Sequence, residues 1–578
     1  MKTLFYSICI LLIFSSCKKT KLDNEMGHLK QFEPGELSGV RLINTAEYGQ
    51  VTVNGNQLTN FIGRKAASPL EPYVIPGSTF WSDGYPGTDY FPVNGYLGRE
   101  WRIPRHLFRE NGRLDLFLED AIGFGGTSRL GITLNGGEKN VDYYLGGYSD
   151  GAAPYFVVSR DETAPARPGY FKIRVINLSY PLSSGYGNPR GLFRDLSGPV
   201  SLCYADGTPV DQRTSHIGYE KRASEYIELP YGKYQFRILH HSGWQLPATD
   251  GDGVTMTLDP PTASTDLNFL APNYQVYAPV HSYQPGSVYT IMVHPSLFRT
   301  MLQLVPLLVN GEHQNAFRVI EDSPPKANPT FCRLQGFNAL PGATLKLRLN
   351  GRELSRDIAY GKGSDYEILN AGKFDIEAYD NDGKLVASGI HPLEANQNYT
   401  AWIYPDKDGK GQISIAANDL SAETFTGNAG QDNAAYGRHR NNFPFSKRFL
   451  NLCPDIPYLT FTRNDGQPLG KTGQEGALTN LVPGKPVLQS PYVGENEVDP
   501  YEILAYRSAP GLAPGVWADD ISPLQSRDFI ANRELYTRIG GPLPVHEPGF
   551  FTVAVIGRVG ANVPAAYKAK MVILKHNK

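Results

Sequence analysis

Short segments in which apolar and polar residues alternate recur along the chain. In residues 113–118 every second residue is leucine, so one face of an extended strand is apolar, and Arg113, Asp115 and Phe117 fall on the other face. Asn-Gly or Asp-Gly closes such segments at four places, 54–55, 206–207, 350–351 and 465–466. These dipeptides favour the positive φ angles of tight hairpin turns. The pattern predicts β-hairpins throughout, with a short helical turn at Pro295–Arg299 as an exception.

Four elements recur in one order. The first is a strand with the pattern Arg-x-x-Asn, at 41–44, 174–177 and 448–451, with a looser copy at 333–338 in which Gly336 stands where the asparagine is expected. The Asn-Gly or Asp-Gly turn follows as the second. The third is a strand that begins at glycine, at 112–118, 232–238 and 372–376, and the fourth begins Tyr-Thr or Phe-Thr, at 289–293, 399–403 and 551–555. This order, repeated with insertions, indicates a tandem repeat.

The repeat and the linkers between its copies predict the domain organisation. Stretches rich in Pro, Gly, Asn and charge separate the copies at 159–169, 321–329 and 420–444. Because each sheet must cover its apolar face with another, we expect a mainly β protein of tandem antiparallel immunoglobulin-like β-sandwich modules. The expected segments are a signal peptide (1–16), a tether (17–36) and four modules (37–163, 170–322, 330–420 and 445–578).

The repeated elements resemble a known family. The order Arg-x-x-Asn, Asn-Gly, Gly-Lys-Phe or Gly-Lys-Tyr, then Tyr-Thr is similar to the module called domain of unknown function 4397, which is common in bacterial envelope lipoproteins. The resemblance is clearest over residues 330–420. Gly336 in the third copy and the missing Gly-Lys strand start in the fourth depart from the pattern. The resemblance implies an architecture and no catalytic residue, because the family has no assigned activity.

The first seventeen residues predict export and anchoring. Lys2 precedes the short apolar segment Leu4–Phe14, and Ser15-Ser16 stand directly before Cys17, as in a bacterial lipoprotein signal. Cleavage would make Cys17 the lipidated first residue, and the alternative is an ordinary signal peptide that contains a cysteine. Lys18 stands where familiar inner-membrane retention signals have aspartate, so we expect the outer membrane. The sequence leaves open whether the protein faces the cell surface or the periplasm.

Composition narrows the class of protein. Lys and Arg number 55 against 57 Asp and Glu, a net charge of -2, which argues against nucleic acid as a partner. No apolar run after the signal is long enough to span a bilayer, so the lipid is the expected membrane contact. Cys203, Cys332 and Cys453 lie in separate modules and lack Cys-x-x-Cys spacing. We therefore expect free buried thiols and neither metal nor cofactor.

Several short motifs resemble catalytic or metal-binding sites but lack the neighbouring elements or spacing that such sites need. Residues 147–151 match Gly-x-Ser-x-Gly, yet a strand rather than a helix is expected after them. Asp-x-Asp-Gly or Asp-Gly-Asp-Gly at 250–253, 380–383 and 406–409 invites a calcium interpretation, while their positions favour solvated hairpin turns. His240-His241 and Asp519-Asp520 are adjacent pairs without metal-site or glycosidase spacing. These patterns predict a protein that is not an enzyme.

A cluster of aromatic residues is the strongest candidate binding site. Seven rings within residues 80–101 are interleaved with Ser, Asp, Gly, Pro and Asn and show no strand period. The candidate binding residues among them are Trp81, Tyr85, Tyr90, Tyr96 and Trp101. Such rings form a platform for sugars or a protein partner if they are exposed, and core if they are buried.

Together these features predict a lipid-anchored envelope protein that is a non-catalytic binding or adhesive scaffold. The expected partners are the membrane, through the N-terminal lipid, and a polysaccharide or an envelope protein. The alternatives are an accessory polysaccharide-binding lipoprotein, a surface glycan hydrolase, and a spacer with no ligand.

Overall fold

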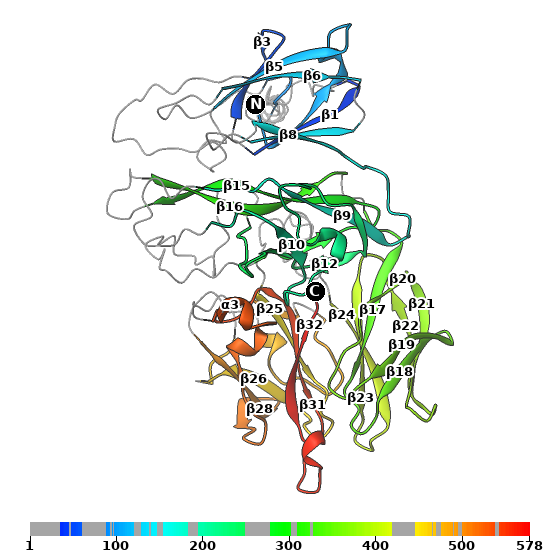
Figure 1. Cartoon of the computed structure of the whole chain (residues 1–578). Coiled ribbons are helices and arrows are strands. Elements are labelled where there is room, and N and C mark those ends of the chain that lie inside the picture. The colour runs from blue at the N-terminus through cyan, green and yellow to red at the C-terminus, as the bar shows by residue number, and fades with distance from the viewer. Residues whose placement is uncertain are drawn as a thin grey trace, which may run out of the picture. The chain divides into compact units, whose positions relative to one another are not determined.

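The computed structural model describes most of the chain beyond the N-terminal segment (Figure 1). The described residues are 35–45, 48–59, 88–92, 95, 97–120, 129–137, 140–146, 154–182, 195–248, 278–301, 309–323, 327–418, 445–464, 466–469, 475–488, 491–494, 500–537 and 543–578. The chain divides into two compact units, Met1–Ser159 and Arg160–Lys578. The second unit contains three of the four β-sandwich modules.

Module 1 is a sandwich of two four-stranded sheets. The first sheet has the order β4-β1-β7-β8, from Glu100–Pro104, Leu37–Asn44, Val141–Leu145 and Tyr155–Ser159. The second has the order β3-β2-β5-β6, from Asn56–Gln57, Tyr48–Val53, Arg113–Asp120 and Arg129–Asn135. A 3-10 turn, η2, spans Arg105–Leu107. The alternating leucines of β5 are buried in the core between the sheets, while Phe117 is exposed, as the pattern predicts.

Module 2 has one long sheet and two short strand pairs. The sheet has the order β11-β9-β15-β16, from Ile227–Pro230, Tyr170–Asn177, Val288–Met301 and Val309–Glu321. The pairs are β10 with β13 (Val200–Cys203, Arg237–His240) and β12 with β14 (Gly232–Tyr234, His281–Tyr283), and η3 spans Gln212–Thr214. The helical turn expected at Pro295–Arg299 is wrong. This segment lies inside β15 and pairs with β16, so the ladder overrides the local preference.

Module 3 is the most regular copy. Its first sheet has the order β20-β17-β23-β24, from Glu367–Asn370, Phe331–Asn338, Asn398–Pro405 and Gly411–Ala417. Its second has the order β19-β18-β21-β22, from Arg352–Ile358, Leu345–Leu349, Gly372–Tyr379 and Leu385–Leu393. The Asn350-Gly351 turn between β18 and β19 has positive φ at both residues, 47° and 77°, as expected for this hairpin type.

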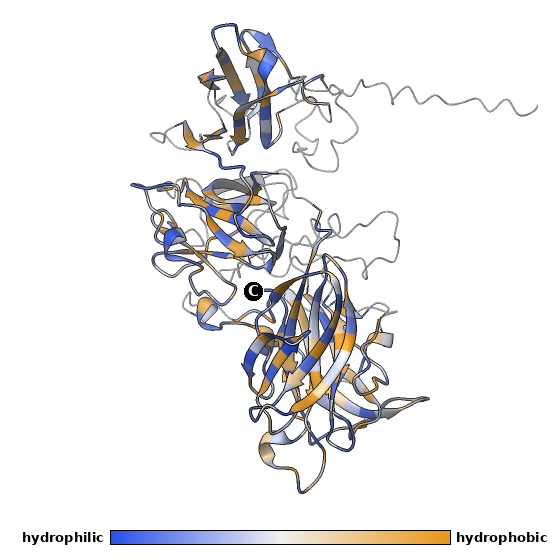
Figure 2. Ribbon diagram, turned by 90° about the vertical axis from the view of Figure 1, so that its right-hand side faces the viewer, coloured by the Kyte–Doolittle hydropathy of each residue, from blue (hydrophilic) through white to orange (hydrophobic). Residues whose placement is uncertain are grey.

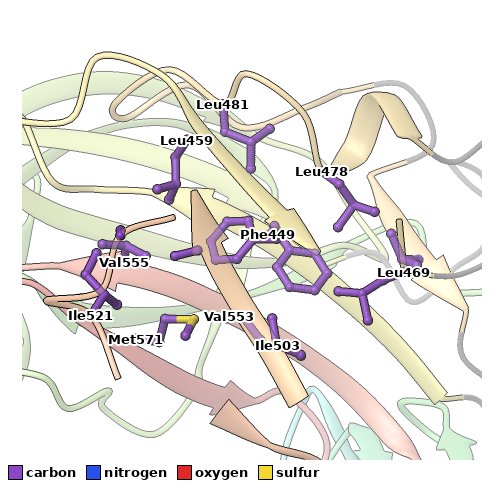
Figure 3. Packing of buried hydrophobic residues seen from close by; sticks show 14 of the residues in the cluster. Phe449, Leu459, Leu469, Leu478, Leu481, Ile503, Ile521, Val553, Val555 and Met571 are labelled. Atoms are coloured by element: carbon purple, nitrogen blue, oxygen red, sulfur yellow. The ribbon is translucent and has the colours of Figure 1, made fainter. Parts of the chain in front are cut away.

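Module 4 carries more irregular structure on its second sheet. The first sheet has the order β27-β25-β31-β32, from Tyr492–Gly494, Phe445–Asn451, Gly549–Ile556 and Lys570–Lys575. The second contains β26, β28, β29 and β30, from Leu459–Arg463, Glu502–Ala509, Leu512–Trp517 and Leu524–Gln525. Short helical segments are η5, η6, α3 and η7, at Glu475–Ala477, Ser526–Phe529, Glu534–Thr537 and Ala565–Tyr567. Figure 3 shows the core, where Phe449 of β25 lies among Leu459, Leu478 and Ile503.

The first sheet of every module has the same topology. The strand that carries the repeated motif runs parallel to a strand far later in the same module, in the pairs β1 with β7, β9 with β15, β17 with β23 and β25 with β31. The mainly β fold of repeated sandwich modules is therefore confirmed, although each first sheet includes one parallel pair. Blue and orange bands along the strands in Figure 2 show the alternation that places one face of each strand in a core.

Among the described residues, no helix has the length and apolar character needed to cross a bilayer.

Candidate functional site

The repeated asparagine is a buried structural clip. In module 2 the side-chain amide of Asn177 donates to the carbonyl oxygens of Gly198 and Ile217, both at 2.7 Å, and its oxygen accepts from the Ser179 amide at 3.0 Å. The same arrangement of two donated bonds and one accepted bond recurs at Asn44, Asn338 and Asn451. All four are nearly buried, so these bonds satisfy backbone groups that water cannot reach.

The repeated arginine reaches across to the parallel strand. The Arg41 Nη2 atom of β1 lies 2.6 Å from the Asp142 carboxylate of β7 in a buried ion pair. Arg174 donates to the Thr290 hydroxyl at 3.0 Å, and Arg448 to the Thr552 hydroxyl at 3.3 Å. In modules 2 and 4 the arginine and the threonine of the Tyr-Thr or Phe-Thr element therefore form one polar contact within the sheet, and in module 1 Asp142 takes the place of the threonine.

Module 3 has the motif two residues later than its sequence suggests. Asn338, and not position 336, makes the clip, and Gln335 takes the place of the arginine by donating to the Thr400 hydroxyl at 2.9 Å. Gly336 faces the core, where an added Cβ would lie 2.2 Å from Leu347 Cδ1. The apparent loss of the asparagine is thus a shift in register, and the glycine is required by packing.

Modules 3 and 4 join through the outer faces of their first sheets. Phe337, Ala339, Trp402 and Ala416 of module 3 form one apolar cluster with Leu450, Leu452, Ala554 and Ile556 of module 4. Arg448 of module 4 donates to the Ala417 carbonyl at 2.8 Å and to the Asn418 side chain. In return, Gln335 Nε2 of module 3 lies 3.2 Å from His576 Nδ1 of module 4. Each motif residue thus contacts the residue that follows the last strand of the other module, as in a two-fold related pair.

Modules 2 and 4 join through a buried charge network. Arg237 of β13 lies 2.7 Å from the Glu547 carboxylate, and the two side chains are 1% and 0% exposed. The Glu547 carboxylate also accepts from the Tyr536 hydroxyl at 2.7 Å and lies 3.4 Å from Lys575 Nζ. Burial by itself would raise the pKa of Glu547, but Lys575 and Arg237 outweigh it and keep the pKa below its usual value. This carboxylate is therefore ionised at neutral pH, and both of its oxygens are bonded to neighbouring groups.

The aromatic cluster is only partly described. Trp101 is 7% exposed and packs against Phe91 in the core of module 1, with ring centroids 5.3 Å apart. Trp101 therefore fills the core and takes no part in a binding platform. Tyr90 is half-buried and its hydroxyl lies 3.1 Å from His106 Nε2. Trp81, Tyr85 and Tyr96 lie outside the described residues.

The acidic turns at 380–383 and 406–409 are closed by their own hydrogen bonds. Asp406 Oδ1 accepts from the amides of Asp408 and Lys410, at 3.0 and 2.9 Å, and the Asp380 turn repeats this pattern. Such bonds are those of an Asx-type turn. Within the described ranges, no group of three or more His, Cys, Asp or Glu side chains is arranged to bind a metal ion. Residues 250–253 and the serine motif at 147–151 lie outside these ranges.

The remaining candidates have structural surroundings. His240 bonds Ser242 Oγ and the Ser197 carbonyl, each at 2.7 Å, and Asp520 is paired with Arg507. The three described cysteines are free and buried. Burial raises the pKa of the Cys203 thiol to about 12 and those of the other two to about 11, so reactive thiolates are suppressed.

One exposed apolar hairpin was missed by the sequence analysis. Leu512, Val516 and Trp517 of β29 are 57%, 67% and 49% exposed, and they are three of the ten exposed large hydrophobic residues in the described part of the chain. Trp517 lies opposite Tyr506 of β28. A signal was present, because residues 508–517 contain no charge and carry Pro-Gly twice. In the described part of module 4, the hairpin carries three of the four exposed large hydrophobic residues, and the fourth is Leu488.

Comparisons with known proteins add little. No family model and no curated protein matches the chain. Among solved structures, "The Bacillus anthracis TIE protein" is 10% identical over 89% of this chain and 69% of that chain, with a TM-score of 0.10. At this TM-score the similarity supports no conclusion about fold or function.

Proposed function

We propose that this protein is a lipid-anchored scaffold of the bacterial cell envelope that binds or adheres without catalysis. The observation that carries the proposal is the joining of modules 2, 3 and 4 through buried contacts, which makes them one compact body rather than separate modules on flexible linkers. The repeated arginines and asparagines support the proposal, because their side chains are used in hydrogen bonds that stabilise each module and not in a catalytic site. Resemblance to the family of unknown function 4397 fits the same role.

The anchor is tested by Cys17→Ala. We expect wild type to incorporate radioactive palmitate and to fractionate with outer membranes, and the variant to lose the label and become soluble. Cys9→Ala is the matched control, since Cys9 lies within the apolar segment that is cleaved away, and it should still be labelled. An unlabelled wild type, or a variant that stays in the membrane fraction, contradicts the anchor. Protease treatment of intact cells distinguishes the surface from the periplasmic face.

Polysaccharide binding is the second candidate, and the exposed Trp517 favours it. An indole ring at a surface, with Tyr506 on the neighbouring strand, offers flat apolar area of the kind that packs on sugar rings. Affinity gels that each contain a different polysaccharide test this candidate. We expect at least one of them to retard the wild type and to retard Trp517→Ala less. Leu488→Ala, which changes a side chain that is 79% exposed elsewhere in module 4, should be retained. Equal retention of both variants would remove this candidate in favour of a protein partner.

A further inference from the structure

Residues 576–578 follow β32 and lie where modules 2, 3 and 4 meet. His576 and Asn577 are 2% and 3% exposed, although they belong to no strand. In Figure 1 the C mark lies beside β12 and β32, in agreement with these contacts. Burial of such a short polar segment requires partners for each of its polar groups.

The backbone of Lys578 pairs with β12 of module 2. The backbone amide of Gln235 donates to the backbone carbonyl of Lys578 at 2.6 Å, and the backbone amide of Lys578 donates to the backbone carbonyl of Lys233 at 3.3 Å. These two bonds on either side of Tyr234 have the pattern of a parallel strand pair. The opposite edge of β12 is paired with β14, so the segment completes the strand on its second edge.

The Asn577 side chain connects module 4 to module 2. Its oxygen accepts from the Phe550 amide of β31 at 2.9 Å, and its amide donates to Gln235 Oε1 at 3.2 Å. Gln235 is fully buried and also accepts from Lys575 Nζ at 2.8 Å. Loss of the Asn577 side chain would remove the acceptor of the Phe550 backbone amide and the bond that joins Asn577 to Gln235, while Lys575 would still bond Gln235 Oε1.

The His576 side chain connects module 4 to module 3. Nε2 lies 2.7 Å from the Thr552 hydroxyl within module 4, and Nδ1 lies 3.2 Å from Gln335 Nε2 and from the Tyr366 hydroxyl of module 3. The Lys578 side chain adds an ion pair with Asp365 at 2.9 Å, but it is 61% exposed. An exposed pair of this kind contributes little.

We propose that residues 576–578 are a clasp, a strand-addition segment whose docking locks module 2 onto the pair of modules 3 and 4. Release of the clasp frees the edge of β12 and removes the backbone pairing and the Asn577 bond that join module 2 to that pair, so the Arg237–Glu547 network has to hold module 2 without them. The inference does not rest on the proposed binding function, because it concerns only how the body is held rigid.

The test compares three forms of the full chain. These are a variant that ends after Lys575, the variant Asn577→Ala, and Lys578→Ala as the matched control. The control keeps the backbone pairing and removes the exposed ion pair with Asp365 and the contact of the Lys578 ammonium with the Tyr204 ring, 5.7 Å from its centroid. Calorimetry should show that modules 2–4 unfold together in wild type and in the control, and that module 2 unfolds separately when the segment is absent. Hydrogen exchange at the backbone amide of Gln235 should become about tenfold faster in Asn577→Ala, and in the control its rate should stay within about twofold of the wild-type rate.

Three results would overturn the clasp. The first is unchanged protection of Gln235 in the shortened chain. The second is joint unfolding of modules 2–4 without residues 576–578. The third is an equal acceleration in Lys578→Ala and Asn577→Ala, which would assign the effect to surface charge. Asn577→Ala keeps the proposal testable even if the shortened chain does not fold.

Discussion

Module 4 contacts its two neighbours by different means. At the junction with module 3, an apolar cluster covers both outer sheet faces, and the polar contacts around it are reciprocal. At the junction with module 2, the buried carboxylate of Glu547 forms ion pairs with two cationic side chains and accepts a hydrogen bond from a tyrosine hydroxyl. The first junction removes apolar area from water, while the second exchanges hydration for directed ionic bonds.

The difference teaches which property each junction supplies. Apolar burial stabilises in proportion to area and tolerates small changes of angle, so it fits two sheets lying face to face. A buried ion network adds little net stability because desolvation offsets attraction, yet it permits one geometry, since an unpaired buried charge is very costly. We therefore expect the junction with module 3 to supply stability and the junction with module 2 to supply orientation.

The largest expected effect is at the charged junction. Glu547→Ala leaves Arg237 and Lys575 buried without their carboxylate, so we expect the free energy of unfolding of modules 2–4 to fall by about 3–5 kcal/mol. Chemical denaturation measures it. Asp519→Ala, an exposed carboxylate of the same module, should change this quantity by less than about 0.5 kcal/mol. A loss below about 1 kcal/mol for Glu547→Ala would mean that water enters the junction and that the network does not fix orientation.

The apolar junction is tested by Leu450→Ala. Leu450 is 3% exposed within the cluster shared by modules 3 and 4, and the truncation should lower the free energy of unfolding by about 3 kcal/mol. Leu488→Ala serves as the control because its side chain is largely exposed. If the two variants unfolded at the same denaturant concentration, the cluster would not be the source of stability.

Two buried histidines of module 4 should also make stability depend on pH, His576 at the junction with module 3 and His546 beside Tyr501 within module 4. Burial, and then Arg448, lowers the pKa of His576 well below its usual value, and burial with Lys447 lowers that of His546 to about 2. Both are neutral when folded and take up a proton when unfolded, so stability is complete above pH 6.5 and falls as the pH drops below it. Each histidine should cost about 1.4 kcal/mol per pH unit in this range. His576→Gln should reduce the slope of stability against pH by that amount, and an unchanged slope would show that His576 is hydrated.

The smallest expected effect is at Trp402. Its ring is fully buried beside Phe337, with centroids 4.6 Å apart, and its indole N–H has no hydrogen-bond partner among the described residues. Trp402→Phe removes the unmet donor while leaving a small cavity, so we expect a loss of about 1 kcal/mol by thermal denaturation. A loss above about 3 kcal/mol would indicate a buried water at the indole nitrogen.

The sequence by itself determined what depends on neighbouring residues. Alternation in β5 placed Phe117 outside and the leucines inside, because strand faces repeat every two residues. Asn54-Gly55 has φ angles of 51° and 86°, since this dipeptide accepts the conformation that the turn between β2 and β3 requires. The tandem β-sandwich organisation followed from repetition of such local signals.

Only the tertiary structure decided which distant residues meet. Arg174 and Thr290 are 116 positions apart, and Arg237 and Glu547 are 310 apart, so no local pattern pairs them. The shift of the third motif to Gln335 and Asn338 became visible only when the parallel partner strand fixed its register. The sequence allowed Trp101 to be part of a platform or of the core and favoured the core, and only the packing of module 1 decided between them, because burial is a property of packing and not of the ring.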